Sequence, residues 1–164
     1  MSNSNIKKVI LGIDPGLAIT GYGLISINKR NIKLLDYGVI TSGAKDAFGS
    51  RLHHLYQELT KIIKKYRPDE VAIEELFFAK NAKTALKVGQ ARGVAYLAAW
   101  QSKSIVREFT PLQVKQAITG YGFAPKQQIQ RMIKLLLALK TVPKPDDVAD
   151  ALAIALCSAQ TKIF

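Results

Sequence analysis

One short segment near the start of the chain constrains the fold more than any other. Residues 9–13 are an uninterrupted run of apolar residues and glycine, and Asp14-Pro15-Gly16 follows it directly. An apolar run without polar alternation is typical of a strand buried on both faces, and Asp-Pro-Gly is a strong turn signal. The segment therefore predicts the central strand of a layered α/β protein, with Asp14 at the strand's carboxyl end.

Strand and helix patterns alternate along the rest of the chain. We expect antiparallel strands over 20–27 and 32–41, joined by a hairpin, and further strands over 70–73 and 104–109. Helical patterns cover 48–67, 81–101 and 125–140. Another helix begins with Thr110 as its N-cap, followed by Pro111. A last helix, which Asp146 or Asp147 caps, ends near Gln160. The order predicts one domain over residues 1–164. Its fold class is α/β, with a mixed five-stranded sheet, three antiparallel strands first, and helices on both faces.

The charge of the chain points to a polyanionic partner. The sequence holds 24 Lys and Arg against 12 Asp and Glu, a net charge of +12. Between residues 76 and 144 there are twelve basic residues and a single acid, Glu108. A solvated basic surface is the plainer explanation, but so one-sided an excess favours nucleic acid binding.

Composition excludes several other classes of protein. A single cysteine, Cys157, excludes an intramolecular disulfide and a multi-cysteine zinc site, and we expect its thiol to lie in the core. No apolar run approaches the roughly 20 residues of a membrane helix. The polar and basic start does not resemble a signal peptide. We therefore expect a cytoplasmic protein that does not bind membranes.

Four acidic residues stand where a site could form. Asp14 and Glu74 follow buried strands, at the sheet edge where open α/β sheets bind ligands, and Asp147 and Asp150 share one face of the last helix. Each of these acids also has a purely structural explanation. Asp14 could begin a turn, and Asp147 and Asp150 could stabilise the start of a helix. Glu74 could lie at an edge position with its carboxylate in water, while Glu75 points inward instead. Taken together, the four are predicted to converge on one pocket.

A pocket of carboxylates favours a hard divalent cation. Crowded carboxylates oppose each other's ionisation, and Mg²⁺ or Mn²⁺ relieves that repulsion. Two such ions can activate water and stabilise the leaving oxygen of a phosphodiester. The sequence has no Gly-x₄-Gly-Lys-Ser/Thr loop for nucleotide phosphates. An acidic pocket within a basic surface therefore predicts a metal-dependent nuclease.

Several ordered motifs carry a family resemblance across nearly the whole chain. They are Gly12-Ile-Asp-Pro-Gly16, Thr20-Gly-Tyr-Gly23, Ala72-Ile-Glu-Glu75 with Phe77 and Ala79-Lys-Asn81, Gly89-Gln-Ala-Arg-Gly93, Val114-Lys-Gln116 and Asp147-Val-Ala-Asp-Ala-Leu-Ala153. As an ordered set they resemble the RuvC family of Holliday junction resolvases, crossover junction endodeoxyribonucleases.

The resemblance implies a fold, an activity and partners. It implies an RNase H-like fold and a homodimer that nicks two strands of a four-way DNA junction symmetrically, leaving 5′-phosphate ends, in recombination and repair. It assigns metal binding and catalysis to Asp14, Glu74, Asp147 and Asp150, with two Mg²⁺ per site for which Mn²⁺ substitutes. Its partners are the branch-migration proteins RuvA and RuvB.

DNA contacts are predicted from the resemblance and from the basic segment together. The resemblance gives Phe77, Lys115 and Lys126; the surrounding basic and aromatic residues add Lys80, Lys83, Lys87, Arg92 and Tyr121.

Three questions stay open on the sequence alone. The small residues Ala85, Gly89 and Gly93 lie either at a subunit contact or against the sheet. The nuclease could act on another nucleic-acid structure, or the protein could bind junctions without cleaving them.

Overall fold

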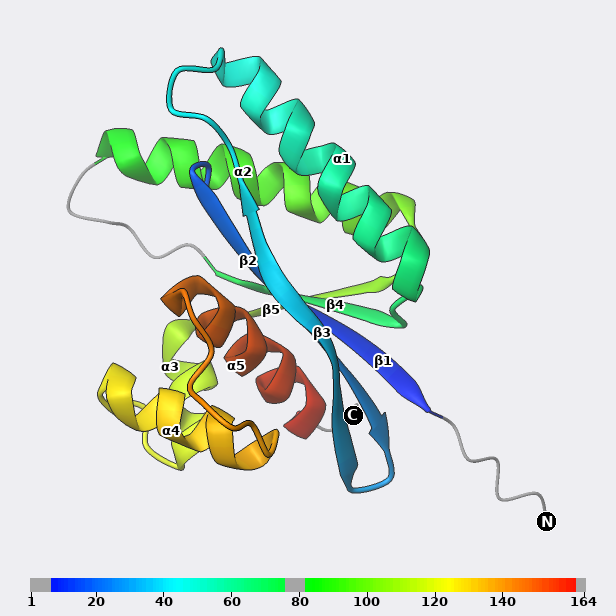
Figure 1. The fold of residues 1–164 in the computed structure, drawn as a ribbon, viewed down its shortest axis with the longest axis vertical. Helices are drawn as coiled ribbons and strands as arrows, with labels where there is room; N and C mark the ends of the chain where they lie inside the picture. Colours follow the sequence, from blue (N-terminus) through cyan, green and yellow to red (C-terminus); the bar gives the residue numbers. More distant parts are fainter. Residues whose placement is uncertain (1–6, 76–81, 162–164) are drawn as a thin grey trace.

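Five strands form one mixed sheet with helices on both faces (Figure 1). This computed structural model describes residues 7–75 and 82–161. The strands are β1 (Lys8–Asp14), β2 (Ile19–Asn28), β3 (Asn31–Thr41), β4 (Glu70–Glu74) and β5 (Ile105–Phe109), in the spatial order β3-β2-β1-β4-β5. The first three strands are antiparallel, and β1, β4 and β5 are parallel. The predicted mixed sheet with a central first strand is confirmed.

The helices divide between the two faces of the sheet. Figure 1 shows α1 (Phe48–Tyr66) and α2 (Ala82–Gln101) on one face, and α3 (Pro111–Thr119), α4 (Lys126–Leu136) and α5 (Asp146–Gln160) on the other. Two hydrophobic cores result. Along β1, Ile10 packs in the core on the α5 side, whereas Leu11 and Ile13 pack with α1 and α2. This alternation decides which strand residues can reach α5.

Three glycines allow α5 to lie directly against the sheet. A Cβ atom on Gly12 would stand 2.1 Å from the carbonyl oxygen of Ala151, and one on Gly21 would stand 2.0 Å from that of Asp147. A Cβ on Gly23 would meet the side chain of Leu152 at 2.5 Å. Any larger side chain would push the helix away, so these positions fix how closely α5 approaches β1 and β2.

Helix termini confirm one prediction and correct two. Thr110 caps α3 with a complete capping box, as expected. Neither Asp146 nor Asp147 caps α5: Pro145 occupies the N-cap position, so both acids fall in the first helical turn. The helix predicted over 125–140 ends at Leu136, because the backbone turns to a φ of 50° at Ala138.

None of the helices in the described part of the chain combines the length and the hydropathy that a membrane span requires. The assignment of residues 1–164 to one domain stays a prediction.

Candidate active site

Asp14 is the last residue of the central strand and projects toward α5. It continues the alternation that places Ile10 on that side, and it pairs in register with Gly21 of β2. Gly21 in turn lies against the Asp147 carbonyl of α5. Strand register and helix approach therefore bring β1, β2 and the first turn of α5 together around Asp14.

Strand alternation also decides between Glu74 and Glu75. Ala72 packs in the core on the α5 side, and its neighbours Val71 and Ile73 pack on the opposite side. Glu74, two residues after Ala72 and still within β4, therefore points toward α5. Because β1 and β4 pair in parallel up to Ile13 and Ile73, Asp14 and Glu74 end neighbouring strands at the same edge.

The electrostatics show that these acids share one environment. Burial, followed by the charges of Glu74, Asp150 and Asp147, raises the pKa of Asp14 from 3.8 to about 7. Burial, followed by the charge of Asp150, raises the pKa of Glu74. Burial likewise raises the pKa of Asp150, against the lowering effect of Lys126. These acids of β1, β4 and α5 therefore lie close enough for their charges to act on one another.

Lys126 supplies the positive charge next to these acids. Its Nζ atom lies 2.9 Å from Oδ2 of Asp150 and 3.5 Å from Oδ2 of Asp146. Asp146 also accepts hydrogen bonds from Lys144 Nζ and Gln130 Nε2, each at 3.1 Å. Asp146 is thus paired with side chains around the site, and its pKa is lowered, first by Lys144. We use "carboxylate cluster" below for Asp14, Glu74, Asp147 and Asp150.

The donor chemistry of the carboxylate cluster fits a hard divalent cation. Its ligands would all be carboxylate oxygens, and burial together with the neighbouring acids raises the pKa of Asp14 and Glu74, which a bound cation would oppose. In the present arrangement, no three His, Cys, Asp or Glu side chains of residues 7–75 and 82–161 converge on one ion position. Lys126 Nζ donates to Asp150 Oδ2 in this arrangement.

Six of the eight predicted DNA contacts fall into three groups. Lys115 and Lys126 lie beside the carboxylate cluster, where both charges lower the pKa of Glu74. Lys83 and Lys87 fall in α2, and Lys87 is exposed. Phe77 and Lys80 lie outside the described residues.

Arg92 is held within the protein. Its Nε atom donates to the carbonyl oxygen of Glu74 at 3.1 Å, and its Nη2 atom lies 2.8 Å from Oε1 of Glu108. The guanidinium is therefore committed to two acceptors on β4 and β5.

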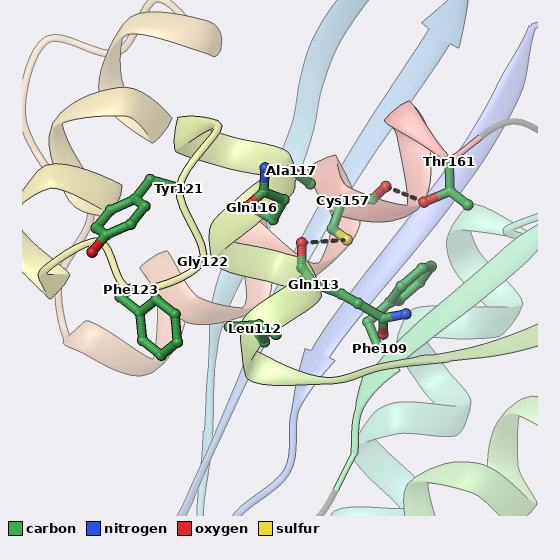
Figure 2. A pocket seen from close by; sticks show the side chains of 10 residues that line it. All are labelled: Phe109, Leu112, Gln113, Gln116, Ala117, Tyr121, Gly122, Phe123, Cys157 and Thr161. Atoms are coloured by element: carbon green, nitrogen blue, oxygen red, sulfur yellow. Dashed lines mark hydrogen bonds between the residues drawn. The ribbon is translucent and has the colours of Figure 1, made fainter.

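The loop between α3 and α4 carries a second aromatic residue that the sequence reading missed. Tyr121 is 58% exposed and Phe123 is 75% exposed, with ring centroids 5.9 Å apart. Figure 2 shows both rings beside a cavity of about 490 Å³, whose lining includes Leu112 and Cys157. The available signal in the sequence was an aromatic residue directly after Gly122 and shortly before Lys126.

Cys157 is buried, as predicted. Its Sγ atom is 3.7 Å from the carbonyl oxygen of Gln113, and burial raises the thiol pKa to about 11. A thiol with this pKa is a poor nucleophile.

The α2 helix presents an apolar face to solvent. Leu86, Tyr96, Leu97 and Trp100 are exposed, as is Ile105 on the neighbouring edge strand β5. The buried residues in the described part of α2 are alanines instead, and they pack in the core that α1 shares with the sheet: Ala91, Ala95, Ala98 and Ala99. Gly93 lies on the exposed side, where an added Cβ would meet nothing within 4 Å. Gly93 therefore does not serve packing on the sheet.

Sequence reading also overlooked Glu70, a fully buried acid at the other end of β4. It accepts hydrogen bonds from Lys8 Nζ at 2.6 Å and from Ser158 of α5, and Arg107 Nε is 3.0 Å away. Glu70 lies on the α5 side of β4, as Glu74 does, so acids at both ends of one strand face α5. No sequence signal separated this acid from an exposed strand-end residue.

Comparisons with known proteins agree with this fold. The family model "Crossover junction endodeoxyribonuclease RuvC" matches residues 10–158. A RuvC from Alkaliphilus oremlandii is 59% identical over 156 residues, 95% of each chain, and one from Desulforamulus reducens is 59% identical over 152 residues, 93% of each chain. The solved structure of Thermus thermophilus RuvC in complex with a Holliday junction substrate is 35% identical, with a TM-score of 0.88 over 93% of each chain. These neighbours confirm the predicted RNase H-like fold class.

Proposed function

Since the chain belongs to the RuvC family of crossover junction endodeoxyribonucleases, we propose that its carboxylate cluster is the centre that cleaves four-way DNA junctions. The protein is an endonuclease that resolves Holliday junctions in recombination and repair. The observation that carries the site assignment is geometric: Asp14 and Glu74 end neighbouring parallel strands at one edge of the sheet, both on the α5 side, and the Asp147 carbonyl of α5 lies against Gly21, which pairs with Asp14. A chain of net charge +12 has little reason to gather acids unless they hold a cation.

The carboxylate cluster would hold the metal, with Mg²⁺ as the proposed ion, two per site, and Mn²⁺ as a substitute. Mg²⁺ held there would supply activation of a water and neutralisation of charge on the phosphate. In the proposed hydrolysis the water oxygen would bond to phosphorus as the bond to the 3′ oxygen breaks in line. The proton lost by the water would balance the one gained by the 3′ oxygen, so the products would be a 5′-phosphate and a 3′-hydroxyl. Lys126 and Lys115, next to the cluster, orient the scissile phosphate and balance its charge.

The remaining DNA contacts extend from the cluster along basic and aromatic residues. Lys83, Lys87 and Lys80 would bind backbone phosphates, a sequence-independent contribution that weakens with salt. Tyr121 and Phe123 support stacking on unpaired bases near the crossover, because both rings are exposed beside Lys126 on the chain. Phe77 keeps its predicted role at the branch point.

A synthetic mobile four-way junction tests this function directly. In Mg²⁺ we expect paired nicks at symmetric positions on two strands of like polarity, which a ligase can reseal, and no nicks without divalent metal. Mapping nicks on all four strands, with a linear duplex of the same sequence as control, gives the result. Equal cleavage of the duplex would favour a nuclease for other substrates, and tight binding without nicking would favour a non-catalytic junction protein.

A homodimer formed through α2 is the second part of the proposal. One exposed face of α2 carries four residues spaced seven, four and three positions apart, which is helical spacing. They are Leu86, Gly93, Leu97 and Trp100. A two-fold interface pairs one surface patch with the same patch of the partner. This face of α2 is apolar, and at Gly93 it leaves room for a close approach, because a Cβ atom there would meet nothing within 4 Å. A second copy of the chain is therefore the proposed occupant.

Replacing Trp100, which is 67% exposed, with glutamate should separate the subunits. Placing a charge within an apolar interface should raise the dimer dissociation constant by at least about 30-fold, or about 2 kcal/mol. Sedimentation equilibrium measures this constant. Leu135→Glu, at an exposed position of α4, is the matched control. If Trp100→Glu leaves the assembly state unchanged, the dimer does not use this face.

Interaction with branch-migration proteins of the RuvA and RuvB type remains part of the proposal, on the family resemblance alone. The cytoplasmic location stays a prediction.

A further inference from the structure

Arg92 connects α2 to the ends of two strands on the far side of the sheet from α5. Its Nε atom donates to the carbonyl oxygen of Glu74 at 3.1 Å, and its Nη2 atom lies 2.8 Å from Oε1 of Glu108. Only 20% of the Arg92 side chain and 35% of the Glu108 side chain are exposed. One planar guanidinium therefore spans the last residue of β4 and the next-to-last residue of β5.

The carbonyl that Arg92 holds belongs to the final residue of β4. Beyond it, the backbone N–H of Glu75 still donates to the carbonyl oxygen of Phe109 at 2.8 Å. Arg92 and Phe109 thus fix the polar groups on either side of the Glu74–Glu75 peptide link. Because the Glu74 side chain projects to the opposite, α5 face, the orientation of this peptide sets where the carboxylate lies.

We propose that Arg92 is a positioning residue that holds Glu74 in the carboxylate cluster from the α2 side. This inference rests on the proposed function, in which Glu74 is a metal ligand. In this role Arg92 would contact the Glu74 backbone and the Glu108 carboxylate and would not itself be a metal ligand. It acts by restricting the backbone that carries the ligand, as outer-shell partners do in other metal sites.

The requirement for arginine follows from the two acceptors. A guanidinium presents several N–H donors in a fixed plane and can bond a carbonyl and a carboxylate at once, whereas a lysine ammonium is a single point of charge on a flexible stem. Glu108 holds the guanidinium in the orientation that leaves Nε facing the Glu74 carbonyl.

Mn²⁺ binding to the DNA-free protein tests the role without relying on activity. Calorimetric titration of Arg92→Gln should show about a 10-fold weaker affinity for Mn²⁺ than the wild-type chain, and Arg92→Lys a smaller loss. Arg131→Gln removes an exposed arginine of α4 with the same change in charge, and should bind Mn²⁺ as the wild type does. Junction affinity without metal should fall no further in Arg92→Gln than in Arg131→Gln.

Three results would overturn the inference. Wild-type Mn²⁺ affinity in both Arg92 variants would remove the positioning role. Weakened junction binding with unchanged Mn²⁺ affinity would make Arg92 a DNA contact. If the wild-type chain itself binds no Mn²⁺, the proposed metal centre fails together with the inference. This outcome differs from loss of the positioning role alone, in which the wild-type chain and both Arg92 variants bind Mn²⁺ equally. Should Arg92→Gln not fold, Arg92→Lys carries the comparison, with its melting temperature as the check.

Discussion

Replacing Asp14 with asparagine is expected to lower the rate of junction cleavage by at least about 10³-fold while the junction still binds. The substitution keeps the size of the side chain but removes an anionic ligand from the carboxylate cluster. Junction affinity should stay equal or rise, because one negative charge near the DNA phosphates is lost. Single-turnover cleavage in Mg²⁺ and a metal-free binding titration measure the two quantities, with Asp46→Asn on an exposed turn as control.

The same substitution should stabilise the metal-free protein, and more so at high pH. The pKa of Asp14 is raised from 3.8 to about 7, so the folded chain binds this proton more tightly than the unfolded chain. The stability contributed by the protonated group is complete below about pH 4 and is lost as pH rises through 7. The substituted amide cannot ionise, so the advantage of Asp14→Asn should reach about 4 kcal/mol at pH 8 and less than half of that at pH 5.

Urea unfolding of both proteins at pH 5 and pH 8, in a chelator, gives this difference. An advantage that does not change with pH would contradict the raised pKa of Asp14. A variant that nicks at the wild-type rate would remove Asp14 from the site.

Replacing Gly21 with alanine should disturb the site through the backbone of α5. The new Cβ would stand 2.0 Å from the Asp147 carbonyl oxygen and 2.4 Å from its carbonyl carbon, so the helix must move. Overpacking against backbone should cost about 3 kcal/mol of stability, and displacement of Asp147 should weaken Mn²⁺ binding about 10-fold or more. Denaturant unfolding and calorimetric Mn²⁺ titration measure the two effects.

Alanine variants at two other glycines serve as comparisons for the stability and Mn²⁺ affinity of Gly21→Ala. Gly49→Ala in α1 meets nothing within 4 Å and should leave both quantities near their wild-type values. Gly23→Ala meets the side chain of Leu152, which can shift, so its cost should be smaller than that of Gly21→Ala. Equal stability of the Gly21 and Gly49 variants would mean that α5 does not depend on close approach at β2.

The fold was predictable because each strand carries a local signal that its neighbours reinforce. The run over 9–13 indicated a buried central strand, and Thr110 with Pro111 marked the start of α3, both of which the structure bears out. The cap of α5 was not predictable from residue type, because an acid near a helix start serves equally well at the N-cap or in the first turn. In the first turn, Asp146 pairs with Lys126 of α4 and with the neighbouring Lys144.

Which acids gather was predictable only in part. Sequence order put Asp14 and Glu74 at strand ends, but the choice of Glu74 over Glu75 needed the alternation of β4. The contacts of Arg92 and Glu70 join segments that are 16 to 88 residues apart, and basic or acidic side chains at such positions look the same in sequence whether they are paired or solvated. Tertiary pairing of this kind has no local signature.

Anomalous diffraction from crystals soaked in Mn²⁺ tests most directly whether these carboxylates serve as a metal centre. We predict manganese density bounded by Asp14, Glu74, Asp147 and Asp150, with the Lys126 ammonium withdrawn from Asp150. Density at another position, or none among these four side chains at a concentration that supports junction cleavage, would contradict the account.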